Sequence, residues 1–183
     1  SVKGLYVAGD EQGEGASYAA VFGWIAGEQA ANRAKEVEQP SLEKAKARIE
    51  ENKSLIEKLC SCKIGPNWRE VNIVLQQIMR DYVGNVRSGA LLKAGFSYLR
   101  RLKNKAYNTM VAKNQHELGR CLEVLNLIEL GELVFVAANA RKETKGKVVR
   151  SDYPLPNPRW RSKVLIVKNI DGKPTTEWRR VKK

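Results

Sequence analysis

Three amphipathic segments follow one another between residues 68 and 141, and only short breaks separate them. Apolar residues recur in each at the spacing of one helix face, and short connections place consecutive helices antiparallel. The sequence therefore predicts a mainly α fold with an antiparallel helical bundle over residues 64–150. The residues expected to face its core are Trp68, Val71, Leu75, Ile78 and Tyr82 in the first helix; Leu91, Leu92, Phe96, Leu99 and Leu102 in the second; and Leu118, Cys121, Leu122, Leu125, Ile128, Leu133, Val136 and Ala140 in the third.

The segments on either side of this bundle have other patterns. Residues 36–63 are expected to form a charged connecting helix that Ser41 caps at its start. Residues 151–183 are expected to form an extended basic tail. Within that tail, Asp171-Gly172 is a turn signal between two strand-like stretches, Lys163–Lys168 and Thr175–Val181, which predicts a small β-hairpin.

The composition indicates which compartment to expect and which kinds of site the chain can form. No run of about 18 apolar residues occurs, so no membrane insertion is expected. Three cysteines, an odd number, favour a reducing compartment, so we expect a cytoplasmic protein. One residue separates Cys60 from Cys62, and His116 is the single histidine, so we expect no metal site. His116 has no apparent base partner, and no catalytic residue is identified.

The positive charge is concentrated at the C-terminal end. The last 45 residues hold 14 of the 33 basic residues but four of the 20 acidic ones. One interpretation is a solvated basic surface that meets an acidic neighbour. The other is nucleic-acid binding, which is disfavoured because no basic and aromatic recognition motif is present. The whole chain could then be a non-enzymatic basic helical module that binds an acidic protein or nucleic acid.

The opening residues have a pattern that suits a bound cofactor. Lys3–Ala8 is strand-like and ends at Gly9-Asp10, a glycine-rich turn follows, and a helix is expected from Ala16 to about Lys35. The Asp10 carboxylate could accept a hydrogen bond from a ribose or ribityl hydroxyl. Backbone N–H groups at the helix start could face a carbonyl oxygen or a developing negative charge. The alternative is turn geometry alone, and no GxGxxG fingerprint follows a strand anywhere.

These segments carry a resemblance to a known family. GLYVAGDEQGEGASYAAVFGWIAGEQAA, residues 4–31, resembles the C-terminal flavin-contacting segment of the fumarate reductase and succinate dehydrogenase flavoproteins. That family includes L-aspartate oxidase and the adenylylsulfate reductase alpha subunit. Residues 67–102 are similar to its C-terminal helical domain, with a VG-x-x-R turn between two helices. Residues 125–160 resemble its last long helix and the loop after it, and residues 163–178 its closing strands.

The resemblance implies a role for the opening segment. Residues 1–35 would be the remnant strand and helix of an α/β FAD-binding domain, with the rest of that domain and the capping domain before Ser1. Gly9 and Asp10 match the family's AG-[D/E] motif, whose acidic residue contacts the ribityl chain of the flavin. The amides of Gly15, Ala16, Ser17 and Tyr18 match those that approach its pyrimidine edge.

Two departures from the family pattern concern polar residues. Fumarate reductases carry a dicarboxylate-binding Arg in the segment where this chain reads GEGASYAAVFG, which has no Arg or His. The family loop close to RxESRGxHxRxDxP here has Lys145 at one Arg position and Val148 at the His position. The basic residues of this loop, Arg141 and Arg150 among them, could approach an anionic substrate, or, as we favour, another domain.

The resemblance also implies a function for the whole protein. It would be an FAD-dependent oxidoreductase that transfers hydride between flavin and a small substrate and exchanges electrons with a partner such as an iron–sulfur subunit. By itself, this chain is expected to be inactive and not to retain FAD. An unpaired strand at its start is expected to favour dimers, because strand edges expose backbone hydrogen-bonding groups.

Overall fold

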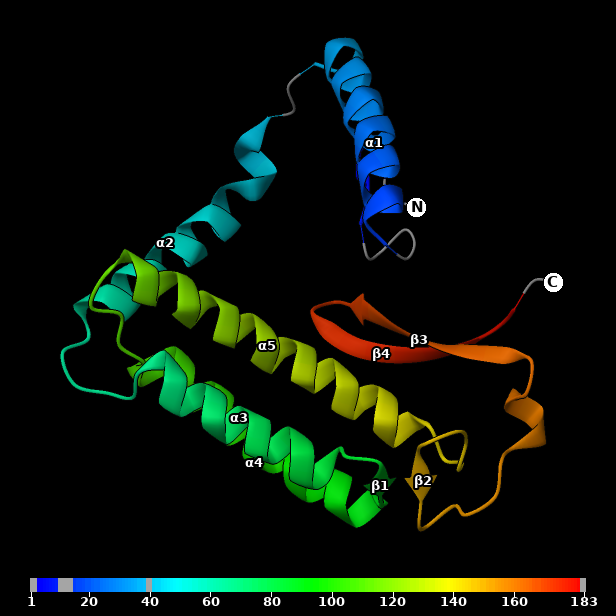
Figure 1. Cartoon of the computed structure of the whole chain (residues 1–183). Helices are drawn as coiled ribbons and strands as arrows, with labels where there is room; N and C mark the ends of the chain where they lie inside the picture. Colours follow the sequence, from blue (N-terminus) through cyan, green and yellow to red (C-terminus); the bar gives the residue numbers. More distant parts are fainter. Residues whose placement is uncertain (1–2, 10–14, 39–40, 182–183) are drawn as a thin grey trace. The chain divides into compact units, whose positions relative to one another are not determined.

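The computed structural model describes residues 3–9, 15–38 and 41–181. The chain divides into two compact units, Ser1–Arg48 and Ile49–Lys183. Figure 1 shows the helices and strands in chain order. The predicted boundaries after residues 35, 63 and 150 remain predictions.

The first unit is built around one long helix. Helix α1, Ala16–Glu36, begins at the predicted residue and contains no buried residue. The predicted strand Lys3–Ala8 is not formed: Lys3-Gly4 is a turn, and the next four residues have no regular structure. A strand is stabilised by a neighbouring strand, and none pairs with these residues in the described part of the chain. A short 3-10 helix, η1 (Leu42–Ala45), follows, and the Ser41 hydroxyl caps it by accepting from the Glu43 N–H.

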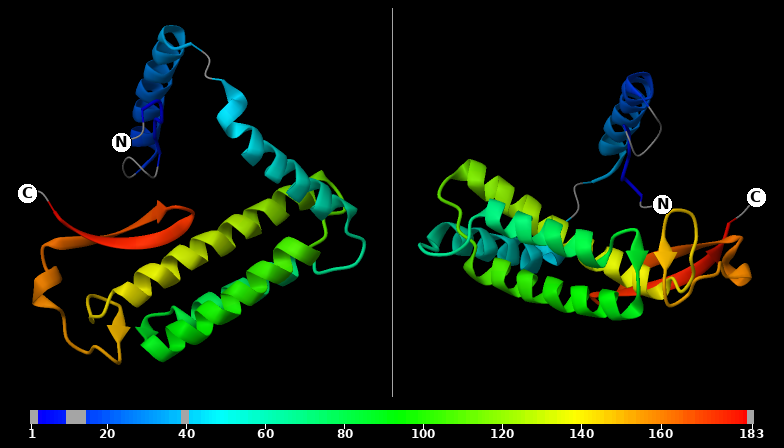
Figure 2. Two further views of the ribbon diagram at one scale, coloured as in Figure 1. Left: turned by 180° about the vertical axis from the view of Figure 1, so that it is seen from behind. Right: turned by 60° about the horizontal axis from the view of Figure 1, so that its bottom comes forward.

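Three helices of the second unit lie side by side, as both views of Figure 2 show. They are α3 (Trp68–Tyr82), α4 (Gly89–Thr109) and α5 (Gln115–Ala140), and helix α2 (Lys46–Ser61) precedes them. Polar side chains cap all three starts. Asn67 and Glu70 form a capping box at α3, and Ser88 and Asn114 accept backbone N–H bonds at α4 and α5. The predicted helical bundle is confirmed.

The bundle core largely matches the sequence pattern, with two corrections. Leu91 and Leu133 were expected inside but are 40% and 42% exposed. The core instead also takes Val124, Phe135 and Ala138 from α5. Helix α5 is apolar around most of its circumference and contacts α3, α4 and both strands of a hairpin. Its apolar spacing therefore does not identify a single inward face.

Two glycines permit close approaches that hold the bundle together. A Cβ at Gly95 in α4 would lie 2.3 Å from Tyr82 Cβ and 2.8 Å from Phe135 Cζ, so α3 and α5 both pack against this bare backbone. A Cβ at Gly65 would lie 1.7 Å from the Thr109 carbonyl oxygen. The loop before α3 can therefore pass directly over the end of α4.

The strands lie at the end of α5. Strand β1 (Val86–Arg87) pairs in parallel with β2 (Val149–Arg150), a pairing too short for the sequence to reveal. Strands β3 (Lys163–Ile170) and β4 (Lys173–Arg180) form the predicted antiparallel hairpin. Asp171 and Gly172 turn it with φ of 51° and 76°, as a two-residue hairpin turn requires.

The segment between β2 and the hairpin is held by an aromatic stack. A 3-10 turn, η2 (Pro158–Trp160), places the Trp160 ring 4.3 Å from the ring of Trp178 in β4, with 15° between their planes. The Arg141 guanidinium lies 5.9 Å from the Trp178 ring centre. The hairpin is thereby fixed against the C-terminal end of α5.

Candidate functional site

The predicted cofactor-contacting residues coincide with the start of α1. Gly15 is the N-cap, with φ of 96° and ψ of 162°, a backbone conformation essentially restricted to glycine. The first helical bond runs from the Ala19 N–H to the Gly15 carbonyl at 3.2 Å. The amides of Gly15, Ala16, Ser17 and Tyr18 therefore have no acceptor within the helix.

Nothing in the described first turn competes for these four amides. No side chain caps the helix, and its first turn has no acidic residue. A Cβ at Gly15 would meet no atom of the described residues within 4 Å. Free N–H groups at a helix start, together with the helix dipole, suit a carbonyl oxygen or an anion. This end of α1 therefore fits the polar edge of a ring such as the pyrimidine of a flavin.

The remaining predicted contacts lie just before this helix start. Gly9 has φ of 90° and open space at its Cβ position, so it too uses a conformation that favours glycine. Asp10 lies outside the described residues. Tyr18 is half exposed and stacks on Phe22 one turn later, with 5.8 Å between ring centres. The four helix-start residues are therefore brought together, while a contact between them and Asp10 is untested.

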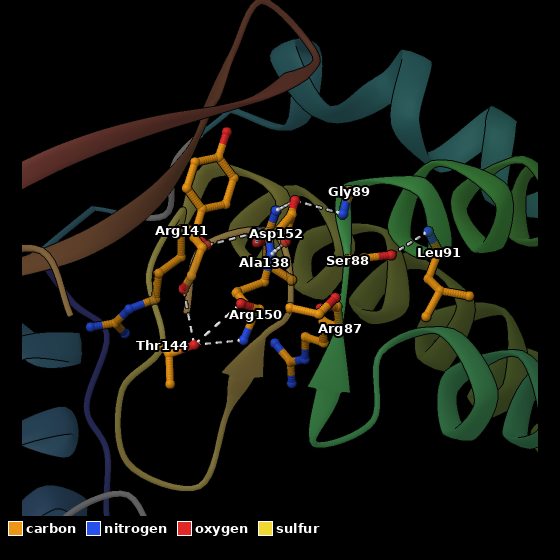
Figure 3. A network of polar contacts seen from close by, with 11 residues as sticks. Arg87, Ser88, Gly89, Leu91, Ala138, Arg141, Thr144, Arg150 and Asp152 are labelled. Atoms are coloured by element: carbon orange, nitrogen blue, oxygen red, sulfur yellow. Dashed lines mark hydrogen bonds and ion pairs between the residues drawn. The ribbon is translucent and has the colours of Figure 1, made fainter. Parts of the chain in front are cut away.

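A second polar centre, which the sequence did not reveal, lies at the end of α5 (Figure 3). Arg150 is 2% exposed, and its Nη1 donates to the carbonyls of Ala138 and Arg141, each at 2.8 Å. Its Nε and Nη2 donate to the two carboxylate oxygens of Asp152 at 2.9 and 2.8 Å. Asp152 Oδ2 also accepts from the Gly89 N–H at 2.9 Å, at the start of α4. This arginine thus joins α4, α5 and β2.

The charges in this centre influence one another. The hydrogen bonds from Arg150 hold the pKa of Asp152 well below its usual range. Burial and the positive charge of Arg150 lower the pKa of Arg87. Arg87 Nε donates to the Gly84 carbonyl at 2.7 Å. The guanidinium groups of Arg87 and Arg150 therefore lie close enough to influence each other, and the Asp152 carboxylate is bound to Arg150.

The buried position of Arg150 corrects the interpretation of the basic loop. Arg150 was grouped with residues that approach an anionic substrate or another domain, but its guanidinium is occupied inside the fold. Glu143, also 2% exposed, accepts from Arg141 Nε at 2.9 Å and from the Asn157 N–H at 2.9 Å. The only sequence signal for this centre was the R-x-D spacing of residues 150–152, which an exposed ion pair would show equally well.

Other candidate residues stay apart from both centres. His116 is exposed in the first turn of α5. Burial raises the pKa of the Cys121 thiol to about 11, so this cysteine is a core residue. Across the ranges that the structure describes, no group of three or more His, Cys, Asp or Glu side chains could hold a metal ion, and no helix is long and apolar enough to cross a membrane.

Curated proteins with similar sequences are flavoproteins. An uncharacterized FAD-dependent oxidoreductase of Methanocaldococcus jannaschii is 28% identical over 146 residues, which cover 80% of this chain and 26% of that protein. The fumarate reductase flavoprotein subunit of Haemophilus influenzae is 27% identical over 169 residues, covering 88% and 28%. The chain therefore spans little more than a quarter of the length of these relatives.

Solved structures of the same type share the fold. Adenylylsulfate reductase from Archaeoglobus fulgidus matches with a TM-score of 0.70 at 21% identity, covering 90% of this chain and 29% of that one. Sdh1 of Mycobacterium smegmatis, solved in complex with UQ1, matches with a TM-score of 0.63 at 26% identity, covering 90% and 28%.

The family described as fumarate reductase flavoprotein C-term matches residues 73–183, from α3 to the end of the chain. This range is more than half of the chain and includes most of α3, all of α4 and α5, the Arg150 centre and the hairpin. The chain therefore belongs to the fumarate reductase flavoprotein C-terminal family.

Proposed function

We propose that this chain is the C-terminal part of an FAD-dependent oxidoreductase of the fumarate reductase and succinate dehydrogenase type. Bound FAD would supply the chemistry that moves a hydride to or from a small substrate. The observation that carries the proposal is the start of α1, where four consecutive amides have no acceptor within the helix and follow an N-cap conformation that only glycine readily adopts. The curated relatives, one named an FAD-dependent oxidoreductase and one a fumarate reductase flavoprotein subunit, support the same cofactor.

Each proposed contact has a distinct role. The amides of Gly15, Ala16, Ser17 and Tyr18 would donate to the pyrimidine edge of the flavin and favour negative charge there. Asp10 would accept from a ribityl hydroxyl, and Gly9 would let the backbone turn toward the cofactor. The segment GEGASYAAVFG, residues 13–23, has no Arg or His where the family has its dicarboxylate-binding Arg, so we propose a small substrate without naming a dicarboxylate.

The exposed apolar surface of α1 supports the proposal that further protein domains surround this helix. Trp24 is 78% exposed, and Val21 and Ile25 are also exposed. Exposed apolar faces of this kind are normally covered by other protein. We propose that the FAD and capping domains of a longer parent chain cover α1, and that an iron–sulfur protein exchanges electrons with the flavin.

A single glycine substitution tests the proposed contact. In the full-length protein, Gly15→Ala would force a side chain into a backbone conformation that disfavours it by about 1–3 kcal/mol. Reshaping the helix start should then weaken FAD binding by about tenfold, since each 1.4 kcal/mol is a factor of ten. The matched control is Gly119→Ala, which also adds one methyl group in open space but has no positive φ. Equal FAD affinity in the two variants would contradict the proposed contact.

A further inference from the structure

A cationic cleft lies between the end of α5 and the start of β3. Its volume is about 680 Å³. Four basic residues line it: Arg87, Arg141, Lys145 and Lys163. Glu143 is the only acidic residue among the described lining residues. All of these residues belong to the second unit.

The positive charge of this cleft is not neutralised within the described chain. Glu143 is already bound to Arg141 and to the Asn157 N–H. The nearby Asp152 carboxylate is bound to Arg150 and Gly89. No ion pair joins Arg87, Lys145 or Lys163 to a carboxylate anywhere in the described ranges. The lowered pKa of Arg87, caused by burial and by Arg150, agrees with an excess of positive charge.

The walls between these charges are apolar. Val134 and Ala137 of α5 face the cleft on one side, and Leu165 of β3 faces it on the other. Small-molecule sites enclose their ligand and aim a few fixed polar groups at it. Here the cations are partly exposed, as for Arg141 at 38% of its side chain. An apolar floor with a charged rim is instead the pattern of a protein–protein interface.

Two other occupants fit less well. Single-stranded nucleic acid stacks its bases on aromatic side chains, and none of the described residues that line this cleft is aromatic. A second copy of the chain would bring the same basic residues against each other, because symmetric interfaces use the same patch twice. Charge complementarity therefore favours a different and acidic protein partner.

We propose that this cleft binds an extended acidic segment of a partner protein. Carboxylates of the segment pair with Lys145, Lys163 and Arg87 at the rim, and its apolar side chains contact the wall formed by α5 and β3. The proposed site uses residues of the second unit alone, and the proposal does not depend on a bound flavin.

Fluorescence anisotropy of the 183-residue chain with a short labelled peptide tests this directly. The peptide alternates glutamate and valine. A peptide that alternates lysine and valine is the charge-reversed control. The double variant K145E/K163E should bind the acidic peptide at least tenfold more weakly than the wild-type chain. The control K142E/K173E has the same net charge, but neither changed residue lines the cleft, and it should bind within about twofold of wild type.

The outcomes separate the alternatives. Loss confined to K145E/K163E, with weaker binding in added salt, supports the acidic partner. Equal loss in both double variants would mean that only net charge matters and would overturn the proposal. Tighter binding of single-stranded DNA than of the acidic peptide, lost in K145E/K163E, would overturn it in favour of nucleic acid. Because no flavin is present in the assay, failure here leaves the proposed flavin contact untouched.

Discussion

Arg150 binds both carboxylate oxygens of Asp152, through Nε at 2.9 Å and Nη2 at 2.8 Å, while its Nη1 donates to two carbonyls at the end of α5. Asp152 in turn accepts from the Gly89 N–H at the start of α4. The pair therefore ties the loop after α5 to two helices of the bundle. The Arg150 side chain is buried and the Asp152 side chain is partly exposed, so solvent screens the interaction little on the arginine side.

Removing Arg150 should destabilise the bundle strongly. Arg150→Ala removes the donor from one buried carbonyl, one partly buried carbonyl and the Asp152 carboxylate, and breaking a buried pair in this way costs about 3–5 kcal/mol. We expect the lower end of that range, because Asp152 is partly exposed. Denaturant unfolding followed by circular dichroism measures the loss. Lys142→Ala, an exposed neighbour, should change stability by less than about 0.5 kcal/mol. A similar small change for Arg150→Ala would contradict the role assigned to it.

The same pair predicts a dependence of stability on acid. Hydrogen bonds from Arg150 lower the pKa of Asp152 in the folded state. The stabilisation is therefore complete above the unfolded pKa of about 3.9 and is lost as pH falls through the folded-state pKa. The difference in unfolding free energy between wild type and Asp152→Asn should be constant near neutral pH and shrink below about pH 4. Glu57→Gln, at an exposed site on α2, serves as the control. A wild-type to Asp152→Asn difference that stays constant down to pH 2 would rule out this coupling.

Two glycines in neighbouring helices should respond in opposite ways to the same change. Gly95→Ala places a methyl group against Tyr82 and Phe135, and such overpacking costs about 1–3 kcal/mol. Gly119→Ala meets no atom within 4 Å in an exposed turn of α5 and should stabilise the helix by about 0.5–1 kcal/mol. Thermal unfolding should show a lower melting temperature for Gly95→Ala and a higher one for Gly119→Ala than for the wild-type chain. A stabilising Gly95→Ala would show that α3, α4 and α5 are not packed as described.

The 183-residue chain itself should not hold FAD. The four amides at the start of α1 would contact one edge of a flavin ring at most, and the sequence has no dinucleotide fingerprint to bind the pyrophosphate. Mixing the purified chain with excess FAD and separating it by gel filtration should give colourless protein. Yellow protein with one FAD per chain would contradict this expectation.

The helices could be predicted from the sequence because their information is local. Apolar spacing depends on a few neighbouring residues, and the sequence pattern predicted the three helices from it. The caps that the structure shows at Asn67, Ser88 and Asn114 are also local. The hairpin turn at Asp171-Gly172 is local in the same way. Helix α5 was harder, since its core-facing side depends on what packs around it, and Leu133 lies on the exposed side.

The Arg150 centre could not be predicted because the contacts that enclose it join segments distant in the sequence. The Gly89 N–H and Asp152 are 63 residues apart, and β1 and β2 pair through two residues each. An arginine in a basic loop ordinarily stays in water, and nothing around Arg150 in the sequence indicates burial. The helix start of α1 was the opposite case. Gly15 and the small residues after it predicted where the helix begins. The strand predicted before it is not formed, because no strand pairs with it among the described residues.

The visible absorption spectrum of the full-length parent protein, recorded before and after dithionite, tests the central claim most directly. The proposed function predicts a flavin spectrum that bleaches on reduction, with FAD bound in a site that the start of α1 completes. A colourless full-length protein that is correctly folded would contradict the oxidoreductase proposal and leave a basic helical interaction module as the better account.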